Sequence, residues 1–238
     1  MDPTAFFSPL LNTNKKTLIL WVSCIVLMVL LIYPGDESSF VKIFPDFTSL
    51  SKYDLDWYKY FFHHSSTFLL FFLIPVLIVL FVFKEKVSEY GFCLGDYKFG
   101  IKATLISFAL LPLPLYINSF DKSFLAEYPL SMKSMESPQN FIFWSMGYLI
   151  YYTGWEFFFR GYLNFGFKNS LGPFTALWIQ TLASTLIHIG KPSGETWSAI
   201  PGGLYLGLLA FRTRSIFWPL LFHFYLGMLN SYFCGLHH

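Results

Sequence analysis

Long apolar stretches separated by short polar segments run through most of the chain. Thr17–Tyr33 contains no charged residue and directly follows Lys15 and Lys16, and Ser66–Phe83 is a second uncharged stretch. A helix that crosses the hydrocarbon core of a bilayer needs about 20 mostly apolar residues. These two stretches therefore predict membrane-spanning helices.

Five further apolar stretches predict five more spans in the rest of the chain. The first of them is broken by Pro112 and Pro114, and the second continues beyond Trp155 as one long helix. Proline interrupts helical hydrogen bonding, so a break is expected at Pro112 and Pro114. The predicted spans are Ala103–Asn118, Ser137–Trp155 with its continuation Glu156–Phe165, Gly172–Ile187, Thr196–Phe211 and Ser215–Leu236.

The segment between the first two spans has a different character. Tyr53–Phe62 interleaves aromatic with charged residues, which predicts a helix lying in the membrane interface rather than crossing it. The expected fold is therefore an all-α, polytopic membrane bundle of about seven to eight transmembrane helices. No internal repeat is visible, so an inverted-repeat transporter has no support.

Composition agrees with a membrane protein. Hydrophobic residues make up 55% of the chain and charged residues only 13%, whereas about 25% of a typical soluble domain is charged. So much apolar area also excludes a disordered chain. The net charge of +2 argues against a nucleic-acid partner, and the 3 scattered Cys suggest neither a disulfide framework nor a zinc ribbon.

The distribution of Lys and Arg indicates an orientation. With seven spans, ten of the 16 Lys and Arg residues fall in segments on the N-terminal side of the membrane. Positive residues are enriched in cytoplasmic segments. We therefore expect an integral protein of the bacterial inner (plasma) membrane, with a cytoplasmic N-terminus and membrane lipid as a partner.

Four ionisable residues lie within or beside the predicted spans: Glu156, Arg160, His188 and His223. Such groups are costly in a membrane and by default mark a functional site. Glu156 and Arg160 stand four residues apart, so they share a helix face and can pair. Two interpretations stay open, namely a structural ion pair and a catalytic carboxylate that Arg160 orients.

The two histidines belong to different helices from Glu156, and bundles turn such groups inward, where they can converge. A glutamate with two histidines suits general-base activation of water, and it also suits a zinc site. No HExxH helix is present, so we expect no metal cofactor and keep zinc as a minor alternative.

Asn230 follows His223 by two helical turns and either shares its cavity or lies at the end of the span. Tyr151 and Tyr152 are interpreted as packing or lipid contacts.

Three blocks, in order, resemble the CAAX-protease and bacteriocin-processing (CPBP, or Abi) family of intramembrane endopeptidases. Trp155–Leu163 (WEFFFRGYL) is similar to the family's EExxxRG block, and Ser184–Pro192 (STLIHIGKP) to its FxxxH block. Gly202–His223 is similar to its glycine-rich helix, basic turn and final histidine. Glu89–Gly100 looks like the link before the family's core, so the resemblance covers about Glu89–Asn230.

The resemblance implies a bundle of about eight helices around a polar cavity, in which a glutamate-activated water hydrolyses a peptide bond with histidine assistance. Carried over to this chain, it makes Glu156, His188 and His223 catalytic and gives Arg160 and Asn230 supporting roles. The substrate would be a membrane-associated protein or peptide. We expect a single transmembrane domain at 1–238, with a family core at 89–230 and with N-terminal spans and an interfacial segment at 1–88.

The sequence departs from the family pattern at two positions that bear on catalysis. Trp155 stands where the family has its first glutamate, which usually serves as the base. Gly227 stands where an Asn or Asp is expected, four residues after the last histidine, and Asn230 is its possible substitute. The first hypothesis is an intramembrane protease that uses Glu156. The alternative is a non-catalytic membrane immunity or scaffold protein of the same fold that has lost the catalytic glutamate.

Overall fold

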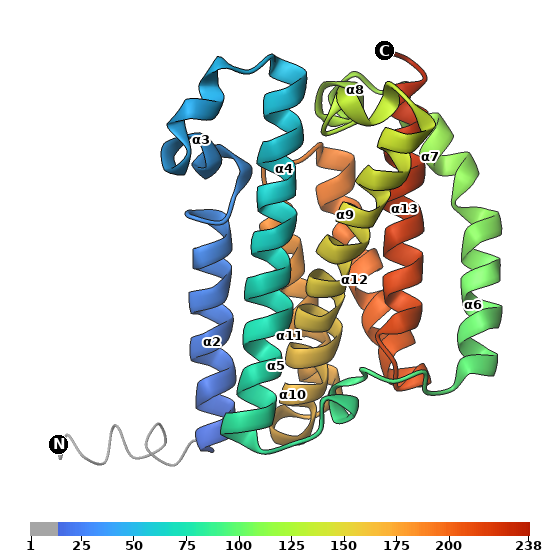
Figure 1. The fold of residues 1–238 in the computed structure, drawn as a ribbon. Coiled ribbons are helices and arrows are strands. Elements are labelled where there is room, and N and C mark those ends of the chain that lie inside the picture. Colours follow the sequence, from blue (N-terminus) through green and yellow to red (C-terminus); the bar gives the residue numbers. More distant parts are fainter. Residues whose placement is uncertain (1–13) are drawn as a thin grey trace, which may run out of the picture.

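A computed structural model describes residues 14–238. Every regular element in this range is a helix, apart from an isolated bridge between Ile189 and Lys191. The long helices run side by side, and the C-terminus lies at the opposite end of the bundle from the start of the described chain (Figure 1). The expected all-helical class is confirmed. The first residues of the predicted N-terminal segment, 1–13, lie outside the described residues.

The first predicted span is the helix α2 (Lys15–Ile32). The side chain of Asn14 accepts a hydrogen bond from the backbone N–H of Lys16 and so caps the start of the helix. Short helices then lead the chain back towards the bundle, namely η1 (Glu37–Ser39), α3 (Phe40–Ile43) and η2 (Pro45–Ser49).

The prediction of a separate interfacial helix at Tyr53–Phe62 is wrong. That stretch belongs to α4 (Lys52–Phe68), which continues through η3 (Leu69–Leu73), α5 (Ile74–Leu77) and η4 (Ile78–Phe83) as one helix of 32 residues. At 1.5 Å per residue this helix is about 48 Å long, which exceeds the ~30 Å hydrocarbon core of a bilayer. Its aromatic and charged end therefore extends beyond an apolar layer of that thickness without needing a break.

The third predicted span divides before Pro112, as expected, whereas Pro114 lies inside the next helix and causes no break. α6 (Tyr97–Leu110) is capped by the side chain of Asp96, and α7 (Pro112–Asn118) begins at the first proline. Two short helices follow near the C-terminal end of the bundle (Figure 1), namely α8 (Lys122–Glu127) and η6 (Met132–Met135).

The remaining predicted spans are also helices. A π-helical segment, η7 (Phe157–Leu163), joins α9 to α10 without a break, so the predicted long fourth helix is present. Gly172 ends it with a φ of +81°, which glycine adopts without strain, and Pro173 starts the next helix. The helices are α9 (Pro138–Glu156), α10 (Asn164–Leu171), α11 (Pro173–Ile187), α12 (Ser193–Thr213) and α13 (Phe217–Gly235).

The irregular link at 84–96, which contains η5 (Val87–Tyr90), is tied to the end of α12. The backbone N–H of Asp96 donates to the carbonyl of Thr213 at 2.7 Å. The Asp96 carboxylate also accepts from Arg212 at 2.8 Å. These bonds fix the turn that leads from α12 into α13, at the end of the bundle where the described chain starts (Figure 1).

Three helices of the described residues are long and apolar enough to cross a membrane: Lys15–Ile32, Lys52–Phe83 and Tyr97–Asn118. α9, α12 and α13 have comparable lengths of 19, 21 and 19 residues but a more polar composition. These apolar helices, together with the family described below, indicate an integral membrane protein.

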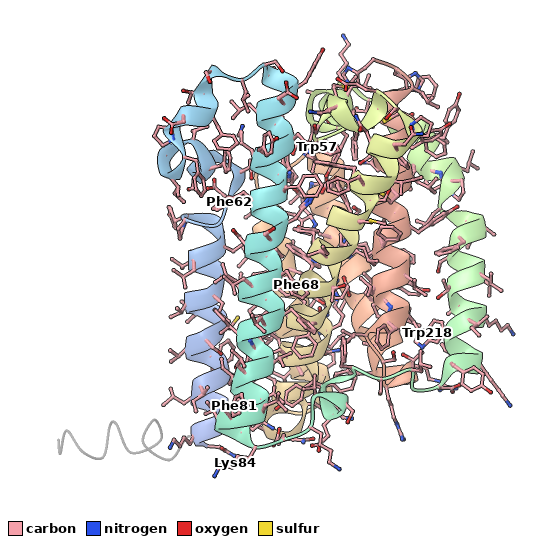
Figure 2. The ribbon with its side chains drawn as sticks, viewed as in Figure 1. Trp57, Phe62, Phe68, Phe81, Lys84 and Trp218 are labelled. Carbon is pink, nitrogen blue, oxygen red and sulfur yellow. The ribbon has the colours of Figure 1, made fainter. Side chains whose placement is uncertain are left out.

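Aromatic side chains pack the centre of the bundle where η7 meets η3. The rings of Phe71 and Phe158 stack with their centroids 4.0 Å apart, and Phe157 and Phe159 beside them are fully buried. Figure 2 shows side chains along the outer faces of the helices as well, with Trp57 and Lys84 towards opposite ends of the long second helix. The packed centre holds η7 rigidly, and η7 carries the first block of the candidate site.

Candidate functional site

Glu156 lies at the junction of α9 and η7 and has no exposed surface. Its Oε1 is 2.6 Å from Nδ1 of His223, on the facing helix α13. An ionised carboxylate only accepts hydrogen bonds, so Nδ1 of His223 carries the hydrogen and donates. The histidine ring is thereby fixed with Nε2 as its remaining polar atom.

Arg160 follows Glu156 by one helical turn, as its sequence spacing predicts. Its Nε lies 3.4 Å from the second carboxylate oxygen, Oε2 of Glu156, which is a longer contact than the 2.7–2.9 Å of a good charge-assisted hydrogen bond. Both side chains are at least 97% buried. Within residues 14–238, neither Nε nor Nη1 of Arg160 has a hydrogen-bond partner.

His188 caps the C-terminal end of α11. Its Nδ1 donates to the carbonyl of Ser184 at 2.7 Å, so Nε2 is again the ring nitrogen left available. The Trp155 ring lies next to both histidines, with centroids 5.5 Å from His188 and 6.3 Å from His223 and its plane nearly perpendicular to each. The residue in the position of the family's first glutamate is therefore in contact range of both histidines.

A cavity of about 410 Å³ unites these side chains. It is lined by His188, His223, Arg160 and Asn230, whereas Glu156 does not line it and reaches it only through His223. Asn230 is buried and lies two turns, about 10 Å, further along α13 than His223. Four of the five residues that the sequence singled out therefore line one cavity, and Glu156 is joined to them by its bond to His223.

Tyr152 was missed as a site residue. Its ring packs on the His223 ring with centroids 4.5 Å apart and lines the cavity, so of the two interpretations packing holds and lipid contact does not. Gly227, one turn after His223, makes this possible, because a Cβ there would meet the Tyr152 ring carbons at 2.8 and 3.0 Å. The sequence spacing could have indicated this position, because Tyr152 precedes Glu156 by four residues and shares its helix face.

The cavity continues towards the end of the bundle where α8 lies, and that part is acidic. Asp36, Glu37 and Glu195 line it, together with Lys191. The Tyr128 hydroxyl donates to both carboxylate oxygens of Glu195, at 3.0 and 2.9 Å. Burial raises the pKa of Tyr128 well above its usual value, so this phenol stays protonated and remains a donor. Sequence reasoning missed this part, because its residues come from loops and helix ends far apart in the chain.

Zinc was the minor alternative to a metal-free site. In the part of the chain that the structure describes, no three His, Cys, Asp or Glu side chains are grouped so that they could hold a metal ion.

The geometry defines a helical protein with a buried glutamate–histidine pair at the wall of a deep cavity. Residues 137–229 match the family model described as type II CAAX prenyl endopeptidase Rce1-like. The chain therefore contains a domain of this CPBP (Abi) family of proteases, and the resemblance seen in the sequence is confirmed. No curated protein and no solved structure matches the chain.

Proposed function

We propose that the protein is an intramembrane endopeptidase that hydrolyses a peptide bond in a membrane-associated protein or peptide. The observation that carries the proposal is the 2.6 Å contact between His223 Nδ1 and Glu156 Oε1, with His223 at the wall of the cavity. A histidine held by a buried carboxylate is the arrangement by which hydrolases obtain a base of fixed tautomer. The family match supports the reaction class.

The arrangement divides the catalytic work between residues. A water molecule in the cavity would give a proton to His223 Nε2 as its oxygen attacks the scissile carbonyl carbon. Glu156 would stabilise the resulting imidazolium without touching the water, because it does not line the cavity. His188 Nε2 would accept the second hydrogen of the water and orient it. The proton held by His223 would then pass to the departing amine as the C–N bond breaks.

The same proposal includes an integral membrane topology of seven to eight spans with a cytoplasmic N-terminus. The Lys16 ammonium pairs with Glu85 at 2.6 Å, and Arg212 pairs with Asp96. These contacts gather predicted cytoplasmic segments at the end of the bundle where the described chain starts. The bacterial inner membrane is the expected location.

Cleavage of defined peptides by the purified protein in phospholipid vesicles tests the function. Two quenched-fluorescent peptides serve as probes, one carrying a farnesylated Cys near its C-terminus and one without the lipid. We expect wild type to cleave at least one, and His223→Asn to lower the rate at least about a hundredfold, the scale of a general-base contribution. The control is His237→Gln, which replaces a histidine that bonds Ser119 away from the cavity.

A non-catalytic role is the second candidate, because specific observations favour it. Trp155 supplies no carboxylate at the cavity wall, and the Tyr152 ring fills the space where a side chain at position 227 would lie. Absence of cleavage of both probes by a folded wild-type protein would favour an immunity or scaffold protein of the same fold.

A further inference from the structure

A small groove lies between the start of α2 and the end of the long second helix (Lys52–Phe83), on the outside of the bundle. It has a volume of about 200 Å³ and shares no lining residue with the central cavity. Its walls are two lysines and three apolar residues, namely Lys15, Lys16, Ile19, Val82 and Phe83. A groove with one cationic and one apolar wall fits a ligand that is itself part anion and part hydrocarbon.

The two helices change from apolar to charged at the same level beside this groove. On α2 the change lies at Lys16, which directly precedes the uncharged stretch Thr17–Tyr33. On the long second helix it lies at Lys84, which directly follows Ser66–Phe83 and stands at the end of the bundle where α2 starts (Figure 2). The Lys16 ammonium donates to both carboxylate oxygens of Glu85, at 2.7 and 2.6 Å, and so aligns the two ends. In a bilayer, the boundary between headgroups and hydrocarbon therefore crosses the groove.

The charged end of the groove carries a surplus of positive charge. Glu85 balances Lys16, and the Tyr90 hydroxyl donates to the same carboxylate at 2.6 Å. Lys15 and Lys84 are exposed, and among residues 14–238 neither forms an ion pair. An ammonium has three N–H donors, so Lys16 keeps one beyond its two bonds to Glu85. This end is therefore suited to bind an anion such as a phosphate.

The apolar side of the groove continues into an exposed apolar surface. Val82 and its neighbour Phe81 are more than half exposed, and so is Val22, which lies one turn beyond Ile19 on the same face of α2. A free phosphate ion would leave this surface unused. A phospholipid uses both parts, because its phosphate meets the lysines while an acyl chain covers the apolar residues.

We propose that the groove binds an anionic glycerophospholipid from the leaflet at this end of the bundle. The lipid phosphate accepts hydrogen bonds from Lys15 and Lys16, and Lys84 adds positive charge beside it. One acyl chain lies along Ile19 and Val82, so the lipid bridges α2 and the long second helix. The site lies outside the central cavity, so lipid binding does not depend on the proposed peptidase function.

Lipid binding by the purified full-length protein tests the site. Radiolabelled phosphatidylglycerol is titrated onto the immobilised protein in neutral detergent, and unlabelled phosphatidylglycerol, phosphatidylcholine or inorganic phosphate competes for it. We expect phosphatidylglycerol to compete at least about tenfold more strongly than phosphatidylcholine, the scale that two lysines near an anionic headgroup provide. Inorganic phosphate should compete weakly, because it makes no apolar contact.

A pair of double variants separates a site from a general electrostatic effect. Lys15→Gln combined with Lys84→Gln should abolish most of the preference for phosphatidylglycerol, because both unpaired charges are gone. Lys98→Gln combined with Lys102→Gln is the matched control, since it makes the same change in net charge on α6, across the bundle from α2 (Figure 1). It should leave the preference unchanged. An equal loss in the two double variants would overturn the site.

A change of shape tests the groove without a change of charge. Val82→Trp places a large ring on an exposed position of the groove wall, so it should weaken phosphatidylglycerol binding at least about tenfold. Leu105→Trp, at a similarly exposed position of α6, should leave binding unchanged. Binding of the Val82→Trp variant equal to that of wild type would overturn the assignment to this groove.

The remaining outcomes concern the identity of the ligand. Equal competition by phosphatidylglycerol and phosphatidylcholine would overturn the preference for an anionic lipid. Inorganic phosphate that competes as strongly as phosphatidylglycerol would show that the lysines bind a free anion instead. Removal of residues 2–13 should leave lipid binding unchanged, and a rise of tenfold or more would make that segment the occupant of the groove.

Discussion

Nδ1 of His223 lies 2.6 Å from Oε1 of Glu156, although 67 residues separate them in the chain. The bond joins α13 to the start of η7 and places a charge partner for the histidine where water does not reach, since Glu156 has no exposed surface. A buried carboxylate in this position holds the orientation and the tautomer of the ring. In our proposal, Glu156 therefore acts on the reaction only through His223.

This relationship predicts non-additive effects on cleavage. Glu156→Gln should lower kcat at least about a hundredfold, because the amide no longer balances the imidazolium charge. Combined with His223→Asn, it should add little further loss, since groups that act as a unit are not independent. The double variant is measured beside both single variants with the better of the two peptide probes. A loss in the double variant equal to the product of the single losses would show that Glu156 acts separately from His223.

The Glu156–Arg160 pair predicts a loss of stability when either partner is removed. Because both side chains are at least 97% buried, Arg160→Met and Glu156→Gln should each destabilise the protein by about 3–5 kcal/mol, the scale for a stranded buried charge. The double variant strands no charge, so its loss should be smaller than the sum. Detergent melting curves measure the four proteins. Arg212→Met is the control, since the exposed Arg212–Asp96 pair should shift the melting temperature little.

The sequence predicted the helices well because apolar length and proline position act locally. Each predicted span is a helix, and the break at Pro112 and the start at Pro173 follow from the missing proline N–H. The exception is Tyr53–Phe62, where composition was interpreted as a change of environment. The helix continues there because a change of environment along its length requires no break in backbone hydrogen bonding.

The sequence singled out candidate site residues but did not show how they contact one another. The spacing along one helix predicted the pairing of Glu156 with Arg160. The bond between Glu156 and His223, in contrast, depends on how α13 packs against α9. Tyr152 escaped notice because aromatic residues are abundant in this chain and most of them only pack. The only local signal was that Tyr152 precedes Glu156 by four residues, which places both on one helix face.

Metal content is a separate prediction. We expect elemental analysis of an active preparation to find well below one zinc per chain, and a chelator to leave cleavage unchanged. The reason is that, among residues 14–238, no three His, Cys, Asp or Glu side chains are grouped so that they could hold a metal ion. One zinc per chain that is lost in His223→Ala would move the mechanism to metal-activated water.

Gly227 packs closely against the Tyr152 ring in the cavity wall, which predicts that a larger residue there is destabilising. A Cβ at this position would lie 2.8 and 3.0 Å from ring carbons of Tyr152, and closer still to its hydroxyl. Tyr152 has little room to yield, because it packs between the rings of His223 and Tyr148. Gly227→Ala should therefore cost about 1–3 kcal/mol, as overpacking of a core does, and lower the melting temperature by several degrees.

Two comparisons make the assignment to Tyr152 specific. Gly194→Ala is the control, since a Cβ there meets Phe124 only at ordinary contact distances of 3.5 and 3.9 Å, and it should leave the melting temperature equal or slightly raised. In a Tyr152→Leu background the aromatic ring is gone, so adding Gly227→Ala should cost little. If Gly227→Ala is as destabilising with Leu at position 152 as with Tyr, the close packing of this ring is not what requires glycine.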